Sequence, residues 1–216
     1  MNEPAAHRMR ALTGSAACFV LALGAAGAVV VVGPERALTS NLVQDTVAAL
    51  AWTVVAAIWA VRGRAAGGVL TIAAAWSVAA AAGGLALTGG PLSVTAGWVC
   101  TWAWGGAVGF SYTLGVLTVA RWRSPSRLEL AALLSTSSMA LGFATLPTVT
   151  VEEGVEYPNP FELPFSPVLS LVGVLLTACT AFAAVAFLAL QLTSPARRRL
   201  ALPALTAAIA GLGGIA

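Results

Sequence analysis

Long uncharged apolar stretches alternate with short charged segments along the whole of the 216-residue chain. A bilayer core of roughly 30 Å needs about 20 apolar residues per helix, and six stretches are complete at that length. They lie near residues 11–32, 42–61, 66–87, 94–120, 128–149 and 168–192. A seventh stretch covers residues 200–216. The pattern predicts an all-α fold: one polytopic transmembrane helical bundle over 1–216, with six complete spans, a truncated seventh and no soluble domain.

Helices are the expected spanning elements because backbone groups in lipid must form hydrogen bonds within their own segment. The alternative, a barrel of strands about 10 residues long with alternating apolar and polar positions, lacks its sequence pattern here. The second stretch is the weakest, since Gln44 and Asp45 shorten its apolar part. Composition agrees with a membrane protein: 59% of the residues are hydrophobic and 9% are charged, with a mean hydropathy of +0.90. We expect the lipid bilayer to be the main partner of the chain.

Arginine predicts the orientation, because short loops rich in Arg or Lys stay in the cytoplasm. Ten of the eleven basic residues fall on one side of the predicted bundle: Arg8, Arg10, Arg62, Arg64, Arg121, Arg123, Arg127, Arg197, Arg198 and Arg199. The loops on the other side hold Arg36 and six acidic residues. We therefore expect a multi-pass protein of the inner (cytoplasmic) membrane with a cytoplasmic N-terminus. The first stretch is long for a cleaved signal peptide, so we interpret it as a retained anchor.

The positive net charge of +3 arises from this asymmetry. It indicates no nucleic-acid partner, because the Arg residues are divided among several loops and form no single basic stripe. Cys18, Cys100 and Cys179 lie in separate predicted helices without a CxxC pair, which argues against a disulfide framework or a metal site. With His7 as the sole histidine and no lysine, neither a Ser-His-Asp triad nor a phosphate-binding loop can be assembled. No cofactor or catalytic residue is predicted.

Ionisable residues are absent from the middle of every predicted span. Proton relays and ion-coupled carriers usually need such groups within the membrane. The sequence therefore argues against a pump or a secondary transporter.

The fourth stretch carries an aromatic cluster, Trp98, Trp102 and Trp104, near its predicted outer end. One interpretation is an aromatic-lined pocket that opens outward and admits a lipophilic ligand or senses the state of the bilayer. The other is an interfacial tryptophan belt followed by a Gly105-x-x-x-Gly109 packing face. We favour the second interpretation and keep the three Trp residues as candidate sensing residues.

Half of the eight acidic residues lie in the segment 151–167: Glu152, Glu153, Glu156 and Glu162. Four prolines in the same segment prevent a helix, so we expect an extended or turn-rich outer loop. Its carboxylates are candidates for sensing a cationic peptide, a polyamine or a divalent ion. The alternative, which we favour, is that an outer loop needs solvation and lacks Arg because of its topology.

A family resemblance adds to this picture. The Trp98–Trp104 cluster, the inner-loop motif Pro125-Ser126-Arg127, the outer-loop dipeptide Asn159-Pro160 and a further apolar run after Ser194 resemble the membrane-spanning input region of actinobacterial sensor histidine kinases. The resemblance covers about residues 90–216. The Phe-Pro-Asp-Gly sequence that often precedes the inner motif in that family is absent here.

The resemblance implies an integral membrane sensor of a two-component signalling system, in which short outer loops detect a signal and the last helices drive a cytoplasmic kinase. This chain holds no kinase core, so histidine kinase activity would require a longer reading frame, including an eighth helix. The expected partners are a second copy, contacted through small-residue helix faces, and a cytoplasmic kinase domain or ATPase. The alternative is a stand-alone polytopic protein that acts as a scaffold or as the membrane subunit of an ABC-type exporter.

Overall fold

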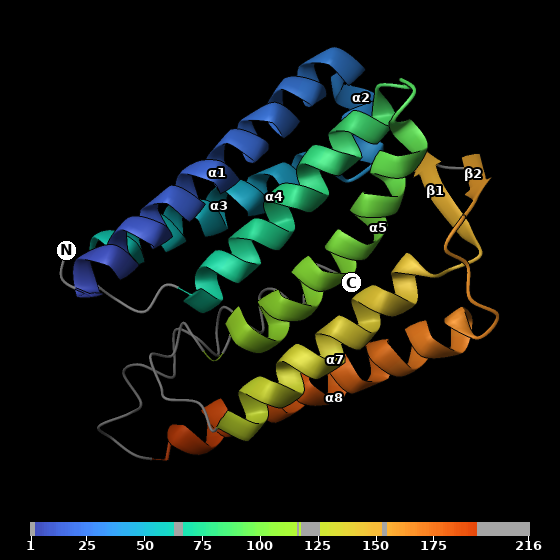
Figure 1. The fold of residues 1–216 in the computed structure, drawn as a ribbon. Coiled ribbons are helices and arrows are strands. Elements are labelled where there is room, and N and C mark those ends of the chain that lie inside the picture. The colour runs from blue at the N-terminus through green and yellow to red at the C-terminus, as the bar shows by residue number, and fades with distance from the viewer. Residues whose placement is uncertain (1–2, 63–66, 116, 118–125, 153–154, 194–216) are drawn as a thin grey trace.

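The computed structural model describes residues 3–62, 67–115, 117, 126–152 and 155–193, and these are mostly helical (Figure 1). The α-helices are α1 (Glu3–Val32), α2 (Pro34–Thr39), α3 (Leu42–Val61), α4 (Gly67–Leu87), α5 (Ser93–Phe110), α7 (Ser126–Ala144) and α8 (Ser166–Gln191). A π-helical turn, η1 (Ser111–Gly115), continues α5, and two strands, β1 (Thr148–Glu152) and β2 (Val155–Pro158), lie between α7 and α8.

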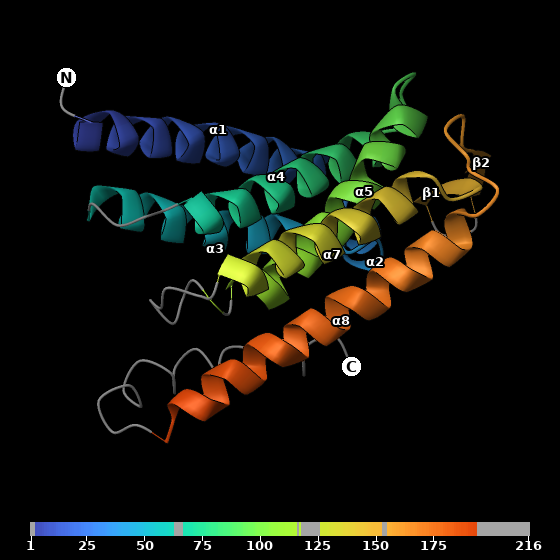
Figure 2. The same ribbon diagram turned by 60° about the horizontal axis from the view of Figure 1, so that its bottom comes forward.

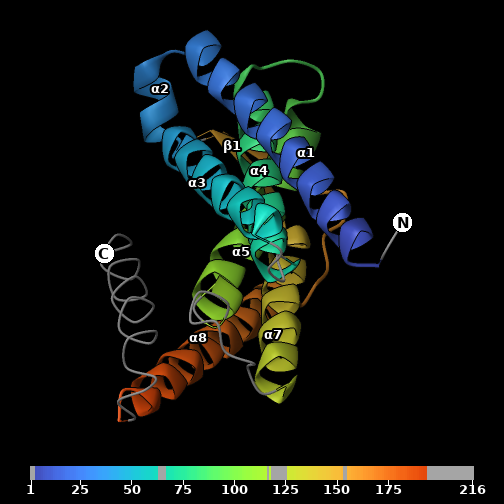
Figure 3. The ribbon, with the colours of Figure 1, turned by 90° about the vertical axis from the view of Figure 1, so that its left-hand side faces the viewer.

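Helix packing joins two groups of helices through α4 and α5. Helices α1, α3 and α4 contact one another; α5 contacts α4 on one side and α7 on the other, and α8 packs against α7. Figure 2 shows α1 and α8 at opposite edges of the molecule, and Figure 3 shows α1, α3 and α4 grouped together, with α2 linking α1 to α3 at the upper left. Helix α5 therefore lies between α4 and α7.

Four of the described helices are long and apolar enough to cross a membrane: Ala5–Val32, Leu42–Val61, Gly67–Leu87 and Ser166–Leu190. Helices α5 and α7 overlap the predicted spans 94–120 and 128–149 but are not among the four. Tryptophan and glycine lower the hydropathy of α5, and four successive hydroxyl-bearing residues, 135–138, lower that of α7. The prediction of a helical membrane bundle is confirmed in this coarser form. The six complete spans are not, and the predicted span 200–216 lies outside the described residues.

A short β-hairpin corrects the all-α expectation. β1 and β2 pair in antiparallel fashion, with Val149 opposite Tyr157 and Thr150 opposite Glu156. The predicted helix over 128–149 ends at Ala144, because Pro147 follows and the alternating β-branched residues after it favour an extended backbone. The segment expected to be a loop therefore includes one complete strand and the last residues of another.

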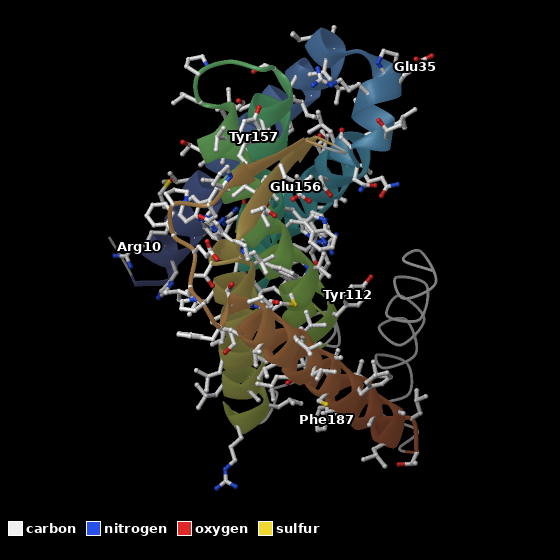
Figure 4. The ribbon with its side chains drawn as sticks, turned by 90° about the vertical axis from the view of Figure 1, so that its right-hand side faces the viewer. Arg10, Glu35, Tyr112, Glu156, Tyr157 and Phe187 are labelled. Carbon is white, nitrogen blue, oxygen red and sulfur yellow. The ribbon has the colours of Figure 1, made fainter. Side chains whose placement is uncertain are left out.

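Successive long helices run in opposite directions, so the arginine residues of different loops come to the same end of the bundle (Figure 1). Arg8 and Arg10 near the start of α1, Arg62 after α3 and Arg127 at the start of α7 lie toward one end. Helix α2, the hairpin and the start of α8 lie at the other. Figure 4 views the molecule from this second end, with Glu156 and Tyr157 on β2. We refer to it below as the hairpin end.

Glycine permits close contact among the last three helices. A Cβ atom added at Gly109 would lie 2.7 Å from Thr136 Cγ2, and one added at Gly105 would overlap the ring of Phe143, so both glycines allow α5 to approach α7. On the other side of α7, a Cβ at Gly173 would lie 2.5 Å from the backbone nitrogen of Met139. The packing role predicted for Gly105 and Gly109 is confirmed.

Candidate functional site

Asn159 organises the hairpin end of the bundle. Its side chain is buried, 5% exposed, and its Nδ2 donates hydrogen bonds to the carbonyl oxygens of Ala144 (2.9 Å) and Leu146 (2.7 Å). Its Oδ1 accepts a hydrogen bond from the backbone N–H of Phe161 (2.9 Å). Two of the carbonyls left open after the last turn of α7 are thereby satisfied, and the chain beyond β2 is tied to that helix.

Trp98 joins α5 to the same point. Its Nε1–H donates a 2.8 Å hydrogen bond to the carbonyl oxygen of Ala144, which therefore accepts from both Trp98 and Asn159. The Trp98 ring also lies against Phe161, with the ring centroids 4.9 Å apart and the planes inclined by 38°. Aromatic pairs in such tilted or offset geometry add about 0.5–1.5 kcal/mol beyond the area that they bury. Three segments far apart in the sequence are thus held together around one carbonyl group.

Trp102 continues this aromatic contact into the bundle. Its ring centroid is 6.3 Å from that of Trp98 in an edge-to-face arrangement, which agrees with the expectation that residues four apart share a helix face. Trp102 also lines a cavity of about 390 Å³ at the junction of α4, α5 and α7. The Trp98–Trp102 pair therefore connects the hydrogen-bonded hairpin end with an open, largely apolar pocket between these helices.

The far end of α5 departs from regular helical geometry. Ser111 begins the π-helical turn η1, and its Oγ accepts a 2.8 Å hydrogen bond from Trp76 Nε1 on α4 while donating one of 2.7 Å to the carbonyl oxygen of Ala107. Single π-turns within α-helices occur frequently at functional sites. Helix α5 thus carries the aromatic contact at one end and an irregular, side-chain-bridged turn at the other.

The predicted sensing residues separate into three groups. Trp98 and Trp102 come together, whereas Trp104 is 41% exposed and takes no part in their ring contact. Glu156 on β2 and Glu162 after it are exposed, as expected of solvated carboxylates. Glu152 ends β1, and Glu153 lies outside the described residues. In the described part of the chain, no three His, Cys, Asp or Glu side chains gather closely enough to hold a metal ion.

Sequence reasoning overlooked the two polar residues that contribute most to this site. Asn159 entered the prediction as part of a motif, and its burial gave no sequence signal beyond its position among prolines. Thr136, fully buried on α7 and lining the cavity, stands within a run of four hydroxyl residues that does not show which one faces inward. Ser138, the last residue of the run, donates an ordinary hydrogen bond to the carbonyl oxygen of Leu134.

Asp45 was noted in the sequence only as a weakness of the second span. In the structure it is 7% exposed in the first turn of α3. A carboxylate at that position lies near the positive end of the helix dipole, which stabilises its negative charge.

Comparison of the chain with protein-family models, with curated proteins and with solved structures finds no match.

Proposed function

We propose that this chain is the membrane-embedded input module of a two-component sensor histidine kinase. The single observation that carries the proposal is the connection from the segment after β2 through Phe161, Trp98 and Trp102 along α5. A change at the hairpin end would reach α5 and α7 together, since both helices meet at the carbonyl group of Ala144. Transmission of this kind needs no catalytic residue in the chain.

The kinase in this proposal comes from the resemblance to the input region of sensor histidine kinases. Asn159, half of the Asn-Pro motif that suggests the family, is the residue that fixes the end of α7. These hydrogen bonds support the proposal more strongly than the dipeptide alone, because loops carry function when a rigid scaffold positions them.

The finer topology belongs to the same proposal. Helices α5 and α7 lie between helices that qualify as spans and would complete six crossings, with residues 200–216 beginning a seventh. The arginine-rich end would face the cytoplasm and the hairpin end the outside. The close-packing glycines of α5, α7 and α8 are used within the chain, so a homodimer would use the open small residues of α1, Gly24 and Gly27, which have nothing within 4 Å of an added Cβ.

The DNA beyond codon 216 and an activity assay test the function. We expect the reading frame to continue into one more helix, a dimerisation segment and an ATP-binding kinase domain. In the full-length protein in lipid vesicles, we expect Asn159→Ala to change the rate of autophosphorylation by severalfold. A stop codon beside a separate ATPase gene would overturn the proposal in favour of an exporter subunit.

Cysteine labelling tests the orientation. With Cys18, Cys100 and Cys179 replaced by Ala, single cysteines at the half-buried Ser40 after α2 and at the exposed Thr88 should react with a membrane-impermeant maleimide added outside the cell. A cysteine at Gly67, exposed at the start of α4, should react only after the membrane is opened. Labelling of the Gly67 variant in intact cells would contradict the topology.

A further inference from the structure

Two phenylalanine side chains are exposed on the segment 159–166, between β2 and α8. Phe161 is 57% exposed and Phe165 is 58% exposed. The segment lies at the edge of the molecule, at the hairpin end (Figure 1). Single exposed apolar residues are common on protein surfaces, so the meaning of these two rings depends on how the segment is held and on what surrounds it.

Backbone hydrogen bonds fix the segment to the end of α7. The N–H of Asn159 donates to the carbonyl oxygen of Pro147 (2.9 Å), and that of Leu163 donates to the carbonyl oxygen of Thr145 (3.1 Å). The N–H of Ser166 donates to the carbonyl oxygen of Leu163 (3.0 Å), which leads directly into α8. Together with the bonds of the Asn159 side chain, these contacts present both rings at defined positions.

The Trp98 contact shows how deep Phe161 lies. Trp98 is five residues inside the start of α5 at Ser93, roughly 7.5 Å along the helix axis at about 1.5 Å per residue. The Phe161 ring packs against it, and Trp98 also bonds to the carbonyl oxygen of Ala144, the last residue of α7. Phe161 therefore lies alongside the ends of these helices rather than beyond them.

An exposed apolar surface continues from Phe165 along α8. Phe165 immediately precedes this helix, whose residues Ser166–Leu190 form a candidate membrane span. Val168 and Leu171 follow at intervals of three residues and are also exposed, so the three side chains share one face. The lipid that covers this face of a membrane-crossing α8 would also reach Phe165.

Glu162 limits the depth of the segment. Its side chain is exposed between the two phenylalanines. A carboxylate is costly in the hydrocarbon core of a bilayer. The boundary between headgroups and acyl chains accepts both kinds of group, since aromatic rings can enter it while charged groups stay hydrated.

We propose that the segment 159–166 binds the headgroup–acyl boundary of the leaflet at the hairpin end. Phe161 and Phe165 insert among the lipids, and Glu162 stays in the hydrated headgroup layer. The partner is an uncharged, zwitterionic phospholipid surface, because the rings need no anionic headgroup and the Glu162 carboxylate repels one. The inference rests on the membrane bundle and is independent of the kinase, so it holds equally for an exporter subunit.

Fluorine NMR tests the proposal with the rings in place. A 4-trifluoromethyl-phenylalanine is introduced singly at Phe161, Phe165, Phe182 or Glu156, in the full chain in phosphatidylcholine nanodiscs. Phe182 is an exposed residue within α8 and is the reference for the acyl core; Glu156, exposed on β2, is the matched reference for water. Dissolved oxygen concentrates in the acyl region, whereas a gadolinium chelate remains in water. The ratio of the two relaxation enhancements therefore measures depth.

We expect the oxygen-to-gadolinium ratio at Phe161 and Phe165 to be severalfold higher than at Glu156 and lower than at Phe182. Replacing half of the phosphatidylcholine by phosphatidylglycerol should leave the two ratios unchanged or lower them. A rise on adding the anionic lipid would overturn the choice of an uncharged surface.

Two further results would overturn the proposal. Ratios at Phe161 and Phe165 equal to that at Glu156 would show that the segment lies in water. Weak enhancement by both reagents would show that protein, such as a second copy of the chain, covers the rings. The probe at Phe165 leaves the contact between Trp98 and Phe161 intact, so its result stands even if the probe at Phe161 disturbs the fold.

Discussion

The two faces of helix α7 differ sharply in how they are packed. Toward α8, glycine on each helix meets backbone on the other: a Cβ at Gly142 would overlap the backbone of Ser170, and one at Gly173 that of Met139. Toward α5, close contact at Gly105 and Gly109 gives way at Gly106 to the cavity lined by Thr136. One helix therefore has a dense face, where no atom can be added, and a face with room to spare.

This difference shows that glycine in a membrane helix has two opposite structural roles. At Gly173 it permits contact between backbones, and at Gly106 it leaves a space. Protein interiors are close-packed, so the open space at Gly106 contrasts with the direct backbone contact at Gly173.

A change of glycine to alanine should therefore alter stability in opposite directions on the two helices that pack against α7, and this is the largest effect that we predict. Gly173→Ala should lower the free energy of unfolding by about 1–3 kcal/mol, because backbone must shift to accommodate the methyl group. Gly106→Ala should raise it by up to about 1 kcal/mol, since the methyl group enters open space and alanine is the better helix former. The midpoint of unfolding by dodecyl sulfate in mixed micelles measures both. Gly27→Ala is the control for helix propensity alone.

The hydrogen-bonded end of α7 should rank next. Asn159→Ala removes three hydrogen bonds and leaves the carbonyl of Leu146 without its partner, at a cost of about 1–3 kcal/mol. Hydrogen exchange at the Phe161 amide should accelerate in the same variant. Asn159→Asp has nearly the same shape but would place an oxygen against two carbonyl oxygens, so it should be at least as destabilising. Full stability in the Asp variant would show that Asn159 serves only to fill space.

The local features of the fold were predictable, and the tertiary ones were not. The length of an apolar run depends only on adjacent residues, so the bounds expected for the second span, 42–61, agree with α3. The first strand was also encoded locally, because four consecutive β-branched residues follow Pro147 in the sequence. The expectation of a loop gave too much weight to the prolines, which come mostly after β2.

A smaller effect is expected where Trp98 joins α5 to α7. Trp98→Phe removes the donor to Ala144 but keeps a ring against Phe161, and should cost about 0.5–1.5 kcal/mol. Trp104→Phe, the same change two turns further on at an exposed position, should alter stability by less than about 0.5 kcal/mol. Thermal unfolding in detergent compares the two variants. Equal losses would mean that aromatic bulk in α5, rather than the hydrogen bond, stabilises this end.

Only part of the site could be predicted from the sequence, and the reason is physical. The i, i+4 spacing of Trp98 and Trp102 places them on one face of any helix, so their contact could be inferred before the fold was known. The cavity could not, because it depends on where three helices diverge. Nor could the sequence distinguish Gly106 from Gly105, although one faces open space and the other the ring of Phe143.

The smallest effect should come from the carboxylates at the hairpin end, far from both faces of α7. Changing Glu152, Glu153, Glu156 and Glu162 together to Gln should leave insertion intact, because acidic residues contribute little to orientation. It should also shift the unfolding free energy by less than about 0.5 kcal/mol per residue, since Glu156 and Glu162 are exposed. The more demanding test is functional. In the kinase-bearing protein, we expect the same dependence of autophosphorylation on spermine or Mg²⁺ as in the unmodified protein, at both low and physiological salt. Exposed charges act over about 8 Å at physiological ionic strength, so recognition of a cation would instead displace the midpoint and make it depend on salt. A displaced, salt-dependent midpoint would move the sensing role from the contacts of Trp98 and Asn159 to the carboxylates of the hairpin end.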